Sequence, residues 1–155
     1  MSNARVWTVY LSGEIHTNWR DQIEADIRSH DLPITFVGPV TDHATSDDCG
    51  VEMLGTETSD FWKDHKGAKV NSVRNKVLMG DADIVVVRFG DKYRQWNAAF
   101  DAGLAHALGK PLIVQHDPIL THALKEIDAA ALAVADTPEQ VAKLLNYAVT
   151  GKLHT

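Results

Sequence analysis

Two acidic residues far apart in the chain are the strongest candidates for chemistry, and the first is Asp101. It lies in an alanine-rich run, four residues after Asn97, and this spacing places both side chains on one face of a helix. Small neighbours would let a ligand approach, so the carboxylate could act as a nucleophile or bind a sugar. The alternatives are an acid stabilised by the helix dipole and, for Asn97, a helix cap.

The second acid, Glu14, follows Gly13 directly after an apolar segment. The turn after the first strand of an α/β protein often binds phosphate through the N–H groups that open the next helix. A carboxylate in that turn would repel phosphate. Glu14 therefore favours a neutral substrate whose hydroxyls it accepts, unless it is simply a solvated acid. Gly13 and His16 lie in the same turn and are further candidate contacts with the substrate.

Other polar residues could complete a site, although no short catalytic motif joins them. Asp42 and His43 form a possible acid–base pair in an irregular segment, and the stretch after the apolar run 84–87 supplies Arg88, Gly90 and Gln95. The eight histidines lack metal-ligand spacing, and no nucleophile elbow, P-loop or dinucleotide fingerprint is present. We therefore expect neither a metal nor another cofactor.

The elements that must position these residues alternate between strand and helix. Apolar and β-branched runs predict strands at 5–11, 33–37, 84–87, 112–114 and 131–135. Apolar periodicity and helix start and stop signals predict helices at 19–30, 68–79, 95–108, 119–127 and 138–149. Residues 38–67 show little periodicity, which predicts a lid, binding loop or subunit contact containing at most a short helix at 60–65.

This alternation predicts one α/β domain over residues 1–155, with a five-stranded parallel sheet between two layers of helices. The number of strands fits a flavodoxin-like, three-layer sandwich with the strand order 2-1-3-4-5. Ligands of such sheets bind beyond the carboxyl ends of the strands, where the order reverses. The turns at 12–18 and 88–97, with the segment that begins at Gly38, would then border one pocket.

Composition limits the partners. The 155 residues are 45 % hydrophobic, which supports one folded domain, and the net charge is −6. An acidic chain is a poor partner for nucleic acids or anionic membranes but can bind a small neutral molecule. The chain shows no signal peptide, no membrane-spanning apolar run and a single cysteine, Cys49. We expect a cytoplasmic protein with a small-molecule substrate.

Several motifs resemble those of the nucleoside 2-deoxyribosyltransferases. The segment 9–13 is similar to the opening Tyr-Leu-Ala-Gly of that family, and 83–87 with 99–105 and 109–113 resembles its strand–helix–strand core. That core carries the pattern Gly-Thr-x-Phe-Glu-x-Gly-x-Ala and ends in Gly-Lys-Pro. Almost the whole chain, including 13–16 and 37–43, is most similar to the small YtoQ-type branch.

The resemblance implies an enzyme that breaks the N-glycosidic bond of a nucleoside or related glycoside. Family members use a carboxylate nucleophile that expels the base, holds a covalent deoxyribosyl intermediate and passes the sugar to a second base. Asp101 would be that nucleophile, and Glu14 would bind sugar hydroxyls or act as an acid. Gln95 and Asn97 would orient the substrate. A neighbouring subunit usually completes the site, which implies a homo-oligomer.

The chain departs from the family pattern at three positions. Asp101 stands where the family has glutamate, and Gln95 and Asn75 stand where it has acids. An amide cannot perform general acid–base chemistry at neutral pH. Two alternatives therefore stay open: a nucleoside hydrolase on the same scaffold, and a non-catalytic module that binds nucleosides or nucleotides.

Overall fold

The computed structural model describes residues 5–92 and 95–153. The chain divides into two compact units. One, which we call the core unit, comprises Met1–Val37 and Ala82–Thr155. The other, the hairpin unit, is Gly38–Asp81.

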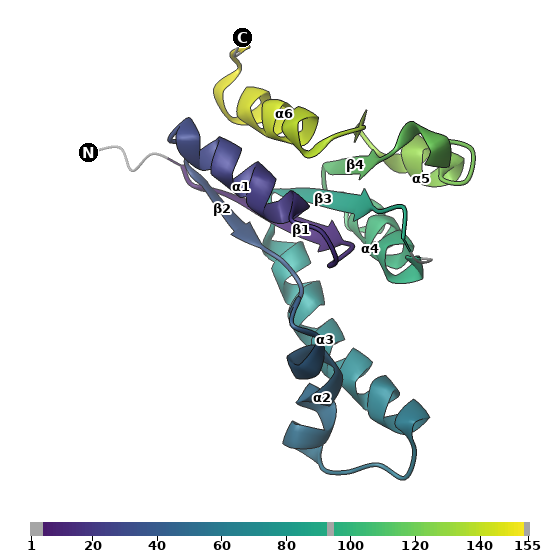
Figure 1. Cartoon of the computed structure of the whole chain (residues 1–155). Coiled ribbons are helices and arrows are strands. Elements are labelled where there is room, and N and C mark those ends of the chain that lie inside the picture. The colour runs from purple at the N-terminus through teal and green to yellow at the C-terminus, as the bar shows by residue number, and fades with distance from the viewer. Residues whose placement is uncertain (1–4, 93–94, 154–155) are drawn as a thin grey trace. The chain divides into compact units, whose positions relative to one another are not determined.

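The core unit is built on a parallel sheet of five strands (Figure 1). In chain order these are β1 (Trp7–Gly13), β2 (Ile34–Val37), β3 (Ile84–Phe89), β4 (Leu112–His116) and β5 (Ala133–Ala135). They lie side by side in the order β2-β1-β3-β4-β5, and every pair is parallel. The predicted α/β class and strand order are thus confirmed. The order reverses between β1 and β3, which pair directly.

Helices cover both faces of this sheet. They are α1 (Trp19–Ser29), α4 (Trp96–Ala107), α5 (Lys125–Ala130) and α6 (Pro138–Thr150). The apolar stripes of α1 and α6 pack on the alternate side chains of β1 and β3 that include Val9, Leu11, Ile84 and Val86. The intervening side chains point to the other face, which α4 covers with its buried alanines Ala98, Ala102 and Ala105.

The region after β4 differs from the helix predicted at 119–127. Pro118 opens a single 3₁₀ turn, η1 (Pro118–Leu120), in which the Asp117 carboxylate accepts from the Ile119 N–H at 2.9 Å. The α-helix α5 begins only at Lys125. A proline at the first position is typical of a helix start, but here it starts a 3₁₀ turn that ends at Leu120, before α5 begins at Lys125.

The hairpin unit overturns the prediction that residues 38–67 lack regular structure. It holds two helices, α2 (His43–Leu54) and α3 (Asp60–Asp81). The predicted helix at 68–79 is therefore only the second half of α3. Both helices have weak amphipathic periodicity. In α2, for example, the first residues are a run of polar and small side chains. Periodicity is the main signal for a helix in sequence, so its weakness explains the error.

Two glycines hold α2 and α3 together. A Cβ on Gly50 would lie 2.5 Å from the Gly67 nitrogen, and a Cβ on Gly67 would lie 3.2 Å from the Asp47 carbonyl oxygen. The helix backbones therefore touch where they cross, as they do at other small-residue crossings. Asn71 reinforces the contact by donating to the Ser46 carbonyl at 2.9 Å.

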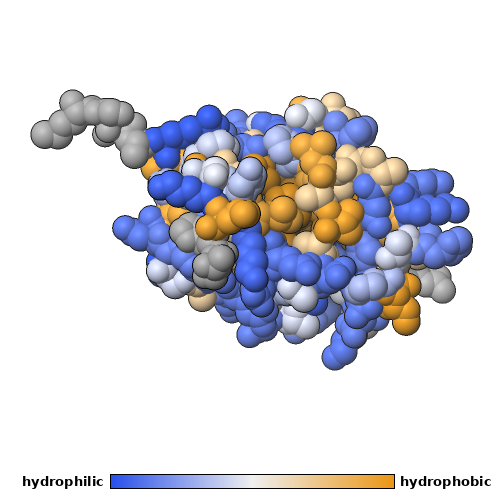
Figure 2. Space-filling view, turned by 90° about the horizontal axis from the view of Figure 1, so that it is seen from above, coloured by the Kyte–Doolittle hydropathy of each residue, from blue (hydrophilic) through white to orange (hydrophobic). Residues whose placement is uncertain are grey.

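Hydrophobic side chains also remain at the surface. Figure 2 shows a hydrophobic patch near the centre of the face seen from above, with hydrophilic residues around it. On α4, Trp96 and Phe100 are 72 % and 71 % exposed. None of the described helices is both long enough and apolar enough to cross a membrane.

The glycine crossing yields a first test. We expect Gly50→Ala to lower the free energy of unfolding by about 1–3 kcal/mol, because the added methyl forces the two helix backbones apart. Gly103→Ala is the matched control, since a methyl added to this helical glycine would meet nothing within 4 Å. That change should be neutral or stabilise by up to about 1 kcal/mol. Urea unfolding followed by circular dichroism measures both; equal effects would contradict the close crossing.

Candidate active site

The Glu14 carboxylate accepts four hydrogen bonds at the carboxyl edge of the sheet. The residue is 6 % exposed. One oxygen, Oε2, accepts from the His16 and Thr17 N–H groups at 2.7 and 3.0 Å. The other, Oε1, accepts from the Thr17 hydroxyl and from Arg88 Nε, the latter at 3.0 Å. A carboxylate has about four acceptor positions, and all four are used.

These bonds decide the charge of Glu14. Burial raises the pKa of the carboxyl group, but the hydrogen bonds from Thr17 and His16 and the charge of Arg88 outweigh it and leave the pKa below its usual value. Glu14 is therefore ionised at neutral pH. An ionised carboxylate cannot donate a proton, so the geometry favours a role in shaping the turn over a role as an acid.

Two glycines make room for this arrangement. Gly13 has φ +124°, and a Cβ there would collide with the Arg88 carbonyl; β1 and β3 can approach so closely only because residue 13 has no side chain. Gly90 lies against the Glu14 side chain, since a Cβ there would be 2.9 Å from Glu14 Cγ. The two predicted glycines thus serve to bring backbone and acid together.

Arg88 extends the network across the sheet. Its Nη1 donates to the Gln115 side-chain oxygen at 2.9 Å, and Gln115 Nε2 donates to the Asp136 carbonyl at 3.1 Å. A continuous chain of hydrogen bonds therefore runs from Glu14 after β1, through β3 and β4, to the residue that follows β5. It holds the carboxyl ends of four strands in line.

Asp101 lies beside this network in a different environment. Asp101 is in the second turn of α4, so its carboxylate is not stabilised by the free N–H groups of the first turn. Its Oδ2 accepts from the Ser12 hydroxyl at 2.5 Å. Burial raises the pKa of Asp101, and the Ser12 hydrogen bond lowers it by less. Ser12 and Glu14 are two residues apart along the chain, so both acids lie at the same end of β1.

The remaining predicted residues of the core unit have local roles. Gln95 precedes α4; its side-chain oxygen accepts from the Gly90 N–H at 2.9 Å, and its nitrogen donates to the Lys92 carbonyl at 3.0 Å. Asn97 is exposed and lies inside α4, so the alternative that it caps the helix is wrong. His16 is exposed beside Glu14.

Asp42 and His43 belong to the hairpin unit. Asp42 caps α2 by accepting from the Thr45 N–H at 2.8 Å, and His43 is the first residue of that helix. Capping explains an acid at this position without catalysis. The prediction that these two residues contact the substrate stays a prediction.

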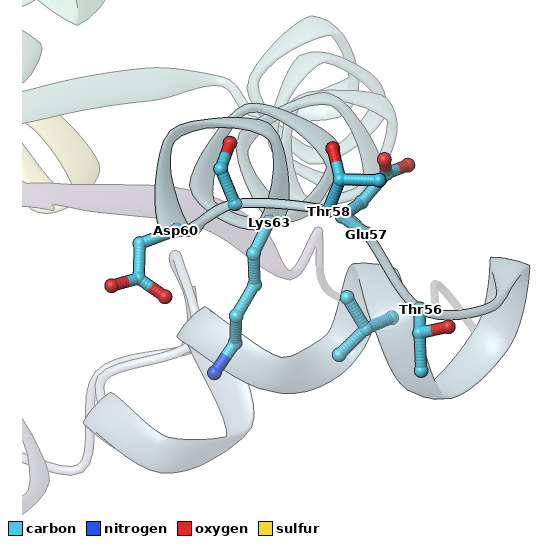
Figure 3. A pocket seen from close by; sticks show the side chains of 7 residues that line it. Thr56, Glu57, Thr58, Asp60 and Lys63 are labelled. Atoms are coloured by element: carbon cyan, nitrogen blue, oxygen red, sulfur yellow. The ribbon is translucent and has the colours of Figure 1, made fainter.

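A pocket of about 270 Å³ whose lining residues are mostly of polar types also lies in the hairpin unit (Figure 3). Two of its three charged lining residues are already paired, Lys63 with Asp48 at 2.6 Å and Glu57 with Lys66 at 2.5 Å, and the third is Asp60. Among the described residues, no three histidine, cysteine, aspartate or glutamate side chains gather as a metal site would require. The acids of the core unit are therefore the better candidates for chemistry.

Four residues that contribute to these contacts were not among the predicted site residues: Ser12, Thr17, Gln115, and Arg20, which donates to the Glu14 and Gly13 carbonyls at 2.7 and 3.2 Å. Two of them carry a signal that could have indicated them. Gln115 is a polar residue in the buried strand Leu112–His116, and Ser12 ends an otherwise apolar stretch of β1. A polar side chain at the carboxyl end of a buried strand needs a partner, and here those partners are Arg88 and Asp101.

The fold and its two acids define an α/β protein with a carboxylate site at the switch point of a five-stranded parallel sheet. The model of the family described as nucleoside 2-deoxyribosyltransferase YtoQ matches residues 10–149. The chain belongs to this family.

Two relatives illustrate the similarity. The chain is 47 % identical over 139 residues to a protein of Bacillus subtilis (strain 168) described as uncharacterized protein YtoQ, covering 90 % of this chain and 94 % of that one. The fold is similar to that of a solved 2-deoxyribosyltransferase from Bacillus psychrosaccharolyticus, with a TM-score of 0.52 and 18 % identity over 87 % of this chain and 90 % of that one. The latter similarity concerns the fold alone.

The Glu14–Arg88 pair gives a test by pH. We expect Glu14→Gln to cost about 1–3 kcal/mol of unfolding free energy at neutral pH, because Arg88 loses its ionic partner. The folded-state pKa of Glu14 is below its usual value of 4.5. The stabilisation is therefore present above that value and is lost as pH falls through the folded-state pKa. Urea unfolding of both proteins from neutral to acidic pH should show the difference narrowing.

A matched control separates this pair from an ordinary surface pair. Glu139, whose pKa is also lowered by its partner, pairs with Lys143 at 2.7 Å on the exposed side of α6. Exposed pairs contribute little, so Glu139→Gln should leave stability almost unchanged across the same pH range. Similar curves for the two variants would mean that the buried network adds nothing.

Proposed function

We propose that the protein transfers a deoxyribosyl group between nucleobases, with the Asp101 carboxylate as nucleophile. The observation that carries the proposal is the contrast between the two acids. Glu14 uses all its acceptor positions within the protein, whereas Asp101 Oδ2 accepts from Ser12 and no hydrogen bond to Oδ1 is found in the described part of the chain. Membership of the nucleoside 2-deoxyribosyltransferase YtoQ family supports the same reaction class.

The proposed reaction has two displacements. An Asp101 oxygen attacks the anomeric carbon, forming a C–O bond as the C–N bond to the base breaks. The departing base takes the bonding electron pair and a proton from water. An incoming base then attacks the same carbon, displaces Asp101 and returns a proton. Two displacements at one carbon retain its configuration, as in retaining glycosidases.

We propose that Glu14 selects an uncharged substrate. The N–H groups of His16 and Thr17, the Thr17 hydroxyl and Arg88 form the kind of donor set that binds phosphate at such turns. In this protein the Glu14 carboxylate occupies it. A nucleoside 5′-phosphate would meet a negative charge and find the donors taken, so a nucleoside is the better substrate.

We further propose that the working form is a homo-oligomer. Trp96 and Phe100 are four residues apart and share one face of α4, where both rings are largely exposed. Aromatic side chains are enriched at subunit interfaces, and covering these two rings would remove apolar surface from water. α4 also carries Asp101, so an interface on this helix would lie near the proposed nucleophile.

The nucleophile is tested by base exchange. With a deoxynucleoside donor and a second free base, we expect Asp101→Asn to lower turnover by a factor on the order of 10³ or more, because the amide cannot form the covalent intermediate. A 2-fluoro-deoxynucleoside should add its sugar to the Asp101 peptide of the wild-type protein in mass spectrometry. Asp21→Asn, an exposed acid on α1, should behave as wild type.

The outcomes separate the alternatives. Unchanged turnover in Asp101→Asn would remove Asp101 as nucleophile. Free sugar released without an acceptor base would assign the chain as a hydrolase, and nucleoside binding without any product would assign it as a binding module.

The oligomer is tested by light scattering after size-exclusion chromatography. We expect the wild-type protein to exceed the 17.1 kDa of one chain and Phe100→Glu to shift it toward the monomer, because a buried unpaired charge is costly. Ile119→Glu is the control, since Ile119 is 82 % exposed on η1, away from α4 in sequence. A monomeric wild-type protein would contradict the proposal.

A further inference from the structure

Ser12 is a buried polar residue that follows buried hydrophobic residues on β1. It is 1 % exposed near the carboxyl end of β1, and its backbone pairs with Val87 of the neighbouring strand β3. Its neighbours on the strand, Val9, Tyr10 and Leu11, are buried hydrophobic residues. Burying a hydroxyl costs free energy unless it is hydrogen-bonded, so a serine at this position needs a hydrogen-bond partner.

That partner is Asp101. The Ser12 hydroxyl donates a hydrogen bond to Asp101 Oδ2, and bonds from a hydroxyl to a carboxylate are stronger than those between neutral groups. Both ends are rigidly mounted. Ser12 pairs with Val87 of β3, and Asp101 is in the second turn of α4, whose alanines are buried. A bond between two fixed elements restricts the rotation of the acid side chain.

This restriction matters for a nucleophile. An attacking oxygen must be held close to its target and in line with the breaking bond, and a misplacement of about 1 Å can cost about 100-fold in rate. With Oδ2 bonded to Ser12, the Asp101 side chain is restrained and Oδ1 is the oxygen left to attack. An unrestrained aspartate would visit several rotamers, of which few point correctly.

We infer that Ser12 is a positioning residue that orients the Asp101 carboxylate for attack on the sugar. The inference rests on the proposed function for its catalytic meaning. Ser12 touches no reacting atom and acts only through Asp101. A purely structural serine would fill space on β1 and satisfy its own hydroxyl, with no effect on the ionisation or reactivity of the acid.

Three variants separate these roles. Ser12→Ala removes the hydroxyl, Ser12→Cys keeps the shape but is a weak donor, and Ser12→Thr keeps the hydroxyl. We expect the alanine and cysteine variants to lose about 10- to 100-fold in kcat, the usual worth of a hydrogen bond to a charged group, with little change in KM. The threonine variant should recover part of the rate. Normal rates in both the alanine and cysteine variants would overturn the inference.

The pH profile adds a readout that a structural role would not move. The Ser12 hydroxyl opposes the rise in the Asp101 pKa that burial causes. In Ser12→Ala that opposition is gone, so the pKa of Asp101 should rise and the acid limb of the rate profile should move to higher pH. An unmoved limb in this variant would contradict the inference.

Carbon NMR of the Asp101 carboxyl group tests the contact without any substrate. If titration shows the Asp101 pKa rising in Ser12→Ala while no deoxyribosyl transfer is found in the wild-type protein, the proposed function fails but the Ser12–Asp101 coupling stands. If transfer depends on Asp101 and yet neither the titration nor the rate responds to Ser12, the inference fails and the proposed function stands. Folding of each variant is checked by circular dichroism.

Discussion

The ion pair between Glu14 and Arg88 is the constraint around which the carboxyl edge of the sheet is arranged. A carboxylate that is 6 % exposed is tolerated only when charge and hydrogen bonds compensate its lost hydration. Arg88 supplies the charge, the turn after β1 supplies N–H groups, and Gln115 fixes the other side of the guanidinium. The turn, β3 and β4 are therefore tied to one another, and the turn cannot relax without leaving a buried charge unpaired.

Two carboxylates at the same end of β1 consequently acquire different properties. Glu14 is surrounded by donors, which keep it charged and leave it no free acceptor position. Asp101 is half-buried with one hydroxyl partner, and burial raises its pKa. Paired acids whose environments push their pKa values in opposite directions are a recurring feature of catalytic sites. In this chain Glu14 anchors the turn after β1, and the proposed function gives the reactive role to Asp101.

The sequence was sufficient for the sheet and insufficient for the hairpin unit. Alternation of buried apolar runs with helical stripes predicted the five strands and their order, because burial on both faces leaves a strong pattern. In α2 and α3 the pattern is weak, and an interhelical contact through Gly50 and Gly67 replaces an apolar stripe. The two acids could be singled out as candidates from the sequence because carboxylates in these positions stand out chemically. Ser12 could not, because its role depends on a residue 89 positions away, a pairing that only the fold reveals.

The alanine face of α4 has one more consequence. Side chains of a single methyl at Ala98, Ala102 and Ala105 set how near the helix axis comes to the strands. Because these side chains are small, α4 can lie close to the sheet. Any larger residue there would lift the helix and carry Asp101 out of reach of Ser12, without touching either one. The residues that these three positions can hold are therefore limited by the distance between Asp101 and Ser12 as well as by packing.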